Sequence, residues 1–362
     1  MTHVELLIIG AGPAGLQAAL SALEAGAHVT LIERSHVLGG QLSKQTHKFF
    51  GSQKQHASKR GIHIMTLLID ALKPYQDRLT IHLETHVVSF YHDYVVGCSQ
   101  GDRYFKLHAK AIIVATGASE KALPFENNDL PGVYAAGAVQ TLMNQYGVKP
   151  GHKVLMVGSG NIGLIVSYQL LQAGIEVVAL VEAAAQISGY LVHASKLRRL
   201  GVPILTKTSI KGAQGEHSVT SATLWDVDDA WQGIPGSEQT VEVDTICISV
   251  GLSPLSDLLA QAGAKVTYIN ELGGFVPWVN QDYETTIPRV FACGDVTGIE
   301  EASSAMVEGQ MVGLLAANQL GHVPEDLPTR IDALKAELKT LRMGPHAKKL
   351  RLGYAKMEGH HV

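Results

Sequence analysis

The hydrophobic pattern of the chain contains one motif twice. In residues 4–34 an apolar run leads into a glycine-rich turn, an apolar helical stretch, a glycine and a second apolar run, and residues 152–182 repeat this order. A glycine just past the helical stretch, Gly26 or Gly174, is typical of a helix C-terminus. Each copy is followed later by an apolar run that ends in glycine, at 111–117 and at 245–251. The pattern predicts an α/β fold with two Rossmann-like dinucleotide-binding domains.

A further apolar run, at 289–295, is followed by a predicted helix from about 303 to 320 and has no glycine-rich turn of its own. We expect it to complete the first domain, so that the second domain is an insertion. The sequence therefore predicts four segments. The first domain has two parts, 1–135 and 253–330, the inserted domain comprises 136–252, and 331–362 form a tail. The basic tail is interpreted either as a solvated helix or as a docking segment for a partner or for another copy of the chain.

Composition narrows the class of protein. The chain has 362 residues, of which 46% are hydrophobic and 17% charged, which suits buried cores and argues against disorder. A net charge of -4 gives no reason to expect nucleic acid. The apolar stretch 154–185 is interrupted by polar residues and is interpreted as a buried unit of the fold, so no membrane span is expected. No signal peptide is predicted from the short first apolar run.

The cysteines Cys98, Cys247 and Cys293 are too far apart for a CxxC or zinc pattern. Cys98 and Cys247 lie in strand-like runs and are expected to be buried and unreactive. So few cysteines fit a reducing cytoplasm, which is the expected location. No metal site is predicted, because His and acidic residues do not fall at ligand spacing.

The first glycine-rich turn has the spacing GxGxxG, with Gly10, Gly12 and Gly15 at the key positions. The first glycine permits the strand-to-helix turn, the second lets the backbone approach a pyrophosphate, and the third allows close packing of helix on strand. The helix N-terminus then offers free N–H groups to phosphates. Glu33, at the end of the second apolar run, is placed to accept hydrogen bonds from ribose hydroxyls.

The second turn gives Gly158, Gly160 and Gly163 the same roles, with Glu182 as its carboxylate. A carboxylate here pairs with ribose hydroxyls and repels a 2′-phosphate, and the residues that follow, 183–185, are alanines. This favours NAD over NADP. The alternative is that the second domain binds a nucleotide only structurally, or binds none.

Together, GAGPAG, Glu33, GGQ at 39–41, ATG at 115–117, GSGNIG and CGD at 293–295 resemble the two-dinucleotide-binding-domain flavoproteins of the pyridine nucleotide-disulfide oxidoreductase superfamily. The resemblance runs from residue 4 to about residue 320, with the motifs in the family's order. It implies FAD in the first domain and NAD(H) or another adenine nucleotide in the second. It also implies that Asp295 bonds the ribityl chain, and that a helix beginning within 301–305 points its positive end at the flavin.

The site residues that the resemblance implies for FAD are Gly10, Gly12, Pro13, Ala14, Gly15, Glu33, Arg34, Gly40, Gln41, Val88, Ala115, Thr116, Gly117, Gly294, Asp295, Ala302 and Ala305. For the second nucleotide they are Gly158, Gly160, Asn161, Ile162, Gly163, Glu182 and Gly251.

The segments 137–151, 168–174 and 196–205 are similar to the flavoprotein subunits of opine oxidases, hydrogen cyanide synthase, dye-linked proline dehydrogenase and sarcosine oxidase. Such proteins usually work with other subunits, and several carry a C-terminal cysteine cluster for an iron–sulfur centre. This chain has no cysteine after Cys293, so it departs from that pattern. The ranges 39–56 and 183–200 also lack cysteine, which argues against a redox-active disulfide.

The segment 42–52 is expected to pass near the flavin, and its candidate catalytic residues are Lys44, His47 and Lys48, with Thr46 beside them. A lysine near the flavin would raise its reduction potential, and His47 could move a proton near neutral pH. The alternative is a solvated surface loop. His193 is more simply interpreted as structural.

Two hypotheses for the function follow. The first is an FAD-dependent oxidoreductase, favoured to use NADH, that passes electrons to a small-molecule or protein acceptor. The alternative is the flavoprotein component of a multi-subunit amine or imino-acid dehydrogenase. A nucleotide-binding scaffold is a third possibility. The resemblance implies a homo-oligomer or a hetero-oligomer with partner subunits.

Overall fold

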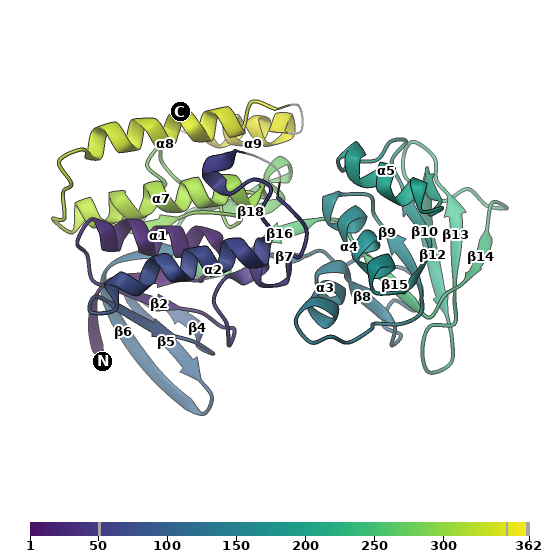
Figure 1. The fold of residues 1–362 in the computed structure, drawn as a ribbon, viewed down its shortest axis with the longest axis horizontal. Coiled ribbons are helices and arrows are strands. Elements are labelled where there is room, and N and C mark those ends of the chain that lie inside the picture. The colour runs from purple at the N-terminus through teal and green to yellow at the C-terminus, as the bar shows by residue number, and fades with distance from the viewer. Residues whose placement is uncertain (50–51, 345–346, 360–362) are drawn as a thin grey trace. The chain divides into compact units, whose positions relative to one another are not determined.

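The computed structural model describes residues 1–49, 52–344 and 347–359. The chain forms two compact units, which are drawn in Figure 1. Unit 1 comprises Met1–Ser119 and Ser253–Val362, and unit 2 comprises Glu120–Leu252. Unit 2 is therefore inserted into unit 1, and the chain passes between them at β7 (Ala118–Glu120) and β16 (Leu252–Pro254).

Unit 1 is built on a seven-stranded sheet with the order β3-β2-β1-β6-β5-β4, in which β19 also pairs with β6. Strands β3, β2, β1, β6 and β19 pair in parallel, whereas β6, β5 and β4 form an antiparallel meander. The runs Leu6–Ile9 and 111–114 are buried, as expected of parallel strands covered on both faces. The strand bounds are β1 Thr2–Ile9, β2 Val29–Ile32, β3 Leu79–His82, β4 His86–Phe90, β5 Val95–Gln100, β6 Arg103–Val114 and β19 Val290–Ala292.

Helices α1 and α7 pack closely on each other in unit 1 (Figure 1). The close approach depends on Gly309, because a Cβ at this position would overlap the backbone of Ala14. The helices are α1 Pro13–Glu24, α2 Gly61–Leu72, α6 Asp257–Gln261, α7 Ala302–Gln319, α8 Leu327–Leu341 and α9 Lys348–Gly359, and β17 (Val266–Ile269) pairs with β18 (Gly274–Pro277). Single 3-10 turns are η1 Gly40–Lys44, η2 Gln53–Gln55, η3 Lys73–Tyr75 and η4 Asn270–Leu272.

The tail is more than a solvated helix. Helix α8 lies along α7 in Figure 1, and α9 contacts η4. Leu338, Leu350 and Met357 are buried against unit 1. The helical spacing of the tail therefore reflects an apolar face that packs on the first unit, and only the opposite face is solvated.

Unit 2 contains a five-stranded parallel sheet with the order β11-β10-β9-β15-β8 and a three-stranded antiparallel sheet, β12-β13-β14. Residues 120–135, which the sequence assigned to the first domain, lie here, because β8 pairs with β15. The predicted fold class, two Rossmann-like domains with the second inserted, is confirmed. The bounds are β8 Val133–Ala135, β9 Lys153–Val157, β10 Glu176–Glu182, β11 Ile204–Thr206, β12 Thr208–Gln214, β13 Ser221–Asp226, β14 Gln239–Glu242, β15 Thr245–Ile248, α3 Ala136–Asn144, α4 Asn161–Gln172 and α5 Leu191–Arg199.

Candidate dinucleotide sites

The turn between β1 and α1 approaches the end of β6 so closely that a side chain at its first glycine would overlap the backbone there. Gly10 has a φ of 101°, and a Cβ there would overlap the carbonyl oxygen of Ala115. A Cβ at Gly15 would overlap the carbonyl oxygen of Gly10. At Gly12, by contrast, an added Cβ would meet nothing within 4 Å. The turn is thus fixed on its inner side and open at its second glycine, where a pyrophosphate would lie.

Helix α1 begins at Pro13 with Gly12 as its N-cap, and no side chain caps it. Uncapped N–H groups and the positive end of the helix dipole favour an anion at this position. Proline at the first helical position costs no hydrogen bond, since its missing N–H would have had no partner in the helix. Ala14 follows and is buried.

Glu33 follows β2 and is 6% exposed. Its Oε2 accepts the Ala11 N–H at 2.9 Å, and its Oε1 accepts the Ser35 N–H at 2.8 Å. Each oxygen keeps a second lone pair for a ribose hydroxyl. Arg34 beside it is exposed, and so is Val88 on β4; Thr85, just before this strand, donates its N–H to the Glu33 carbonyl at 3.0 Å.

The GGQ segment lies against the turn. The Gly39 N–H donates to the Ala11 carbonyl at 2.8 Å, and a Cβ on Gly40 would come within 2.8 Å of the Gly12 Cα. Gln41, the second residue of η1, is exposed. The segment therefore forms one wall of the open space at Gly12.

The ATG segment follows β6. Ala115 donates its N–H to the Ile9 carbonyl at 2.8 Å, and the Thr116 hydroxyl donates to the Leu255 carbonyl at 2.8 Å. Gly117 has a φ of 72° with nothing within 4 Å of an added Cβ. This segment is held by the backbone of unit 1 and leaves Gly117 open.

The segment after β19 reaches the start of α1. A Cβ on Gly294 would lie 2.9 Å from the Ala14 Cβ. Asp295 accepts the Glu300 N–H at 3.4 Å, and burial raises the pKa of the Asp295 carboxyl to about 7. Helix α7 begins at Ala302, Ala305 is buried, and no side chain caps the helix. The structure thus brings together five of the predicted FAD segments: Gly10–Gly15, Glu33, Gly39–Gly40, Ala115–Gly117 and Gly294–Asp295.

The sequence did not reveal a group of buried and half-buried polar side chains that contacts Gly294 through Glu308. We call Tyr283, Glu300, Glu308, Arg342 and Tyr354 the Arg342 cluster; its members come from the turn before β19, the loop before α7, helix α7, the end of α8 and helix α9. Glu308 is 2% exposed, and burial raises its pKa to about 7 even though Arg342 acts in the opposite direction. One signal was available, since Glu308 is the sole charged residue within 302–319.

The three catalytic candidates lie just after the GGQ segment. Lys44 is the last residue of η1, and the His47 ring stacks on Phe49 with 5.4 Å between the ring centroids. Lys48 is exposed, and its backbone forms an isolated antiparallel β-bridge with Arg60. Residues 50 and 51 of the predicted flavin-facing segment lie outside the described residues. The catalytic roles of these side chains stay a prediction. His193 is 7% exposed in α5, and burial lowers its pKa, which fits a structural residue.

The second turn repeats the first in its backbone. A Cβ on Gly158 would overlap the Ser249 carbonyl oxygen, and one on Gly163 would overlap the Gly158 carbonyl oxygen, whereas one on Gly160 would meet only the Ser188 hydroxyl oxygen, at 3.9 Å. Helix α4 begins at Asn161, and Ile162 follows. The Asn161 Oδ1 accepts the Tyr190 N–H at 2.8 Å.

Glu182 ends β10 and is held by more donors than Glu33. Its Oε2 accepts the Ser159 N–H at 3.1 Å and also the Ser159 hydroxyl, and its Oε1 accepts the Ala184 N–H at 3.0 Å. Gly251 is exposed, and its carbonyl accepts the Lys121 N–H at 3.0 Å. The carboxylate is oriented as that of Glu33 is, but one of its oxygens accepts an additional hydrogen bond from a hydroxyl group.

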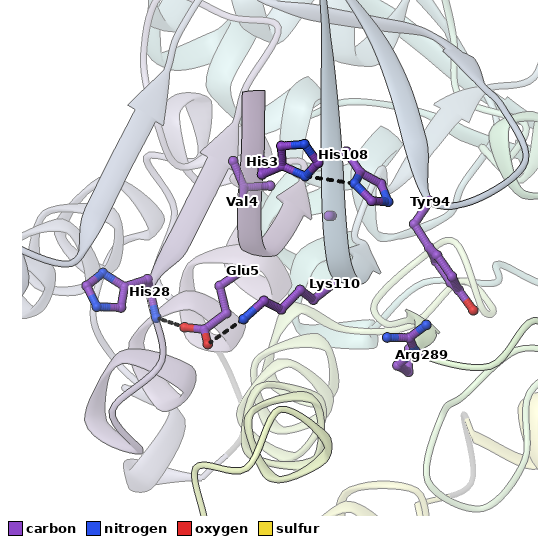
Figure 2. A pocket seen from close by; sticks show the side chains of 9 residues that line it. His3, Val4, Glu5, His28, Tyr94, His108, Lys110 and Arg289 are labelled. Carbon is purple, nitrogen blue, oxygen red and sulfur yellow. Dashed lines mark hydrogen bonds and ion pairs between the residues drawn. The ribbon is translucent and has the colours of Figure 1, made fainter. Parts of the chain in front are cut away.

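A surface cavity of about 590 Å³ lies at the amino end of β1 (Figure 2). The Gly10 turn follows the carboxyl end of the same strand. The cavity's histidines His3 and His108 face each other with 2.9 Å between Nδ1 atoms, and Glu5 accepts the His28 N–H at 2.8 Å. Burial alone would raise the pKa of Glu5, but hydrogen bonds from His28 and His322 hold it below its usual value. The cavity is therefore separate from the dinucleotide turn.

Three further observations concern the thiols, metal binding and membrane spans. Cys98, Cys247 and Cys293 are buried, and burial raises the pKa of each thiol, that of Cys98 to about 11. Among residues 1–49, 52–344 and 347–359, no group of three or more His, Cys, Asp or Glu is placed to hold a metal ion. Across the same part of the chain, no helix combines the length and apolar character that crossing a membrane requires.

The chain is similar to known proteins over most of its length. The sequence model of the pyridine nucleotide-disulphide oxidoreductase family matches residues 4–309. The alpha chain of sarcosine oxidase from Corynebacterium sp. (strain P-1) is 26% identical over 90% of this chain and 34% of that protein. One of the opine oxidase subunits of Agrobacterium tumefaciens (strain Ach5) is 24% identical over 87% of this chain and 66% of that protein.

Among solved structures, L-proline dehydrogenase from P. horikoshii superimposes with a TM-score of 0.69 at 23% identity, over 92% of this chain and 59% of that chain. The chain thus spans one third to two thirds of the length of these three known proteins. The likeness to the solved structure confirms the two-unit fold.

Proposed function

Because this chain belongs to the pyridine nucleotide-disulphide oxidoreductase family and is an FAD-dependent oxidoreductase, we propose that unit 1 binds FAD along the β1–α1 turn and that unit 2 binds NADH as the electron donor. The observation that carries the first part is the open space at Gly12, which is walled by Gly40 and faced by the uncapped start of α1. This space fits a pyrophosphate, and bound FAD would supply the two-electron chemistry.

The chain's own residues bind and orient in this proposal. Glu33 would hold the adenosine ribose, since each of its oxygens has a free lone pair. Asp295 would accept a hydrogen bond from the ribityl chain, and the start of α7 would place its positive end near the flavin ring. Lys44, His47 and Lys48 are the proposed residues for tuning the reduction potential and moving a proton.

NADH is proposed over NADPH because Glu182 is fixed by the Ser159 and Ala184 N–H groups at the end of β10. A fixed carboxylate at this point accepts ribose hydroxyls and repels a 2′-phosphate.

A second candidate function is favoured by the names of the relatives, which are subunits of sarcosine and opine oxidases. The chain would then be the flavoprotein component of an amine- or imino-acid-oxidising complex, and unit 2 would hold a nucleotide structurally. Partner subunits and an oligomeric assembly belong to this candidate.

One experiment separates the candidates. The full chain is purified, its visible spectrum is recorded, and it is mixed anaerobically with NADH, NADPH, sarcosine or proline while the flavin absorbance is followed. Rapid bleaching by NADH and slow bleaching by NADPH is the expected result. Bleaching by an amine or imino acid but not by NADH would favour the second candidate, and a colourless protein that does not take up added FAD would contradict both.

A further inference from the structure

The Arg342 cluster connects the C-terminal tail to the segment that follows β19. Glu308 is its centre: Oε2 accepts the Gly294 N–H at 2.6 Å and faces the Thr297 hydroxyl at 3.4 Å. The other oxygen, Oε1, accepts the Tyr283 hydroxyl at 2.9 Å and an N–H of Arg342. The conformation of residues 294–297 therefore depends on where this carboxylate is held.

Arg342 holds both acidic members of the cluster at once. Its Nε donates to Glu300 Oε2 at 3.0 Å, and Nη2 contacts Oε1 of both Glu300 and Glu308. Nη1 donates to the Tyr283 hydroxyl at 3.0 Å, and the guanidinium lies 4.4 Å from the Tyr354 ring centroid. Because Glu300 precedes α7 and Glu308 lies within it, Arg342 fixes the start of this helix from two sides.

Burial makes this arrangement sensitive to charge. The side chains of Arg342, Glu300 and Glu308 are 15%, 6% and 2% exposed. Loss of the guanidinium would leave two buried carboxyl groups without their cation, and such a break is far more disruptive than loss of a surface ion pair. Glu300 also donates its N–H to Asp295, so a shift of Glu300 would reach the carboxylate proposed to face the ribityl chain.

We propose that Arg342, at the end of α8, is a positioning residue for FAD: through Glu300 and Glu308 it sets the segment Gly294–Thr297 and the start of α7, so the C-terminal tail is part of the flavin site. This inference rests on the proposed binding of FAD to unit 1. Arg342 is not expected to touch the cofactor, and its effect is transmitted by the two glutamates.

The test compares Arg342→Met with Arg330→Met. Arg330 lies on the same helix and pairs with Glu24 at 3.3 Å at the surface, so its replacement removes the same charge without touching the cluster. FAD affinity is measured by fluorescence titration of the apoprotein, and the midpoint potential of the bound flavin is measured in parallel. We expect Arg342→Met to raise the FAD Kd at least tenfold and to make the potential more negative, while Arg330→Met stays within twofold of the parent.

Rescue separates positioning from general stability. Removing one buried carboxylate charge with Glu308→Gln in the Arg342→Met background is expected to recover at least part of the lost affinity, and Arg342→Lys is expected to fall between parent and Arg342→Met. If Arg342→Met does not fold, Tyr354→Phe, which removes the hydroxyl that donates to Glu300 at 3.0 Å, must raise the Kd severalfold. Equal losses in Arg342→Met and Arg330→Met, or parental affinity and potential in Arg342→Met, would overturn the inference. Failure of the parent protein to bind FAD would instead overturn the proposed function.

Discussion

The glycine-rich turns of unit 1 and unit 2 make equivalent backbone hydrogen bonds. In unit 1 the Ala11 carbonyl accepts the Gly39 N–H at 2.8 Å, and in unit 2 the Ser159 carbonyl accepts the Gly189 N–H at 2.9 Å. The carboxylates Glu33 and Glu182 each accept the N–H of the residue after the first glycine. The two turns thus have the same backbone hydrogen bonds, including the bond from a later segment, at Gly39 or Gly189, back to the turn.

The difference lies in what surrounds each turn. In unit 1, Ala11 adds no side-chain donor, and Gly294 and helix α7, which follow unit 2 in the chain, pack on the start of α1. In unit 2, Ser159 adds a hydroxyl that donates to Glu182 and accepts the Ser188 N–H at 3.1 Å. The same motif therefore lies in a unit built from two separate ranges of the chain and in a unit built from one continuous range, and this should decide how each site responds to substitution.

The largest expected effects come from filling the second glycine of each turn. Gly12→Ala should lower FAD affinity at least a hundredfold with little loss of fold stability, because the new methyl group projects into open space where the pyrophosphate would lie. Gly160→Ala is the matched variant in unit 2, and it should slow reduction by NADH while leaving FAD affinity unchanged. Titration with FAD and anaerobic mixing with NADH measure the two effects. If each variant impaired both ligands equally, the two turns would not be independent sites.

The next largest effect is expected at Asp295, which follows Gly294 and has no counterpart described in unit 2. Burial raises its folded-state pKa to about 7, so its contribution to stability is complete below about pH 4 and is lost as the pH rises through 7. Between pH 5 and 8 the apoprotein should therefore lose about 2–3 kcal/mol that Asp295→Asn does not lose.

Urea unfolding of unit 1 at both pH values measures this difference. Trp278 lies in unit 1, so its fluorescence can be followed in a background with Trp225→Phe and Trp231→Phe in unit 2. Parallel pH profiles for parent and variant would show that Asp295 titrates at its ordinary value.

A smaller effect is expected from neutralising the two carboxylates. Glu182→Gln should weaken NADH about 10- to 100-fold, since a hydrogen bond to a charged group contributes about 1.5–3 kcal/mol. Glu33→Gln should weaken FAD by a similar factor and leave NADH unaffected. Dissociation constants for each ligand with each variant provide the cross-check. Unchanged NADH affinity in Glu182→Gln would favour the second candidate function.

The smallest effect should come from making the second turn like the first. Ser159→Ala removes the hydroxyl between Glu182 and Ser188 and should cost unit 2 about 1 kcal/mol of stability. It also frees a lone pair on Glu182, so NADH affinity should not fall. Thermal unfolding followed by Trp225 fluorescence tests the first statement, and a marked loss of NADH affinity would contradict the second.

The sequence revealed the repeated unit because local patterns determine it. Strand, turn, helix and carboxylate lie within about thirty residues of each other, and their periods and glycines are fixed by backbone geometry. The Arg342 cluster could not be assembled in this way, because Tyr283, Glu300 and Arg342 lie far apart in sequence and meet only through tertiary packing. Glu308, a single charge in an apolar helix, indicated that a buried partner exists but not which residue supplies it.

The tail and residues 120–135 show the same limit of prediction from the sequence. A helix in the tail was predicted, but the packing of α8 within unit 1 depends on residues from elsewhere in the chain. Residues 120–135 were assigned to the first domain, but β8 pairs with β15 in unit 2, and local sequence patterns do not reveal this pairing.

The insertion of unit 2 has a consequence for biosynthesis. A ribosome that has made the Gly10–Gly15 turn must still translate all of unit 2 before Gly294, α7 and Arg342 emerge. At ordinary translation rates this interval is roughly 15–65 s. During that time the nascent unit 1 lacks β19 and α7, the partners of β6 and α1 that follow unit 2 in the chain. Unit 2 itself can already be complete. In the proposed function, the flavin site can therefore be completed only after unit 2 has been made, although the Gly10–Gly15 turn precedes unit 2 in the chain.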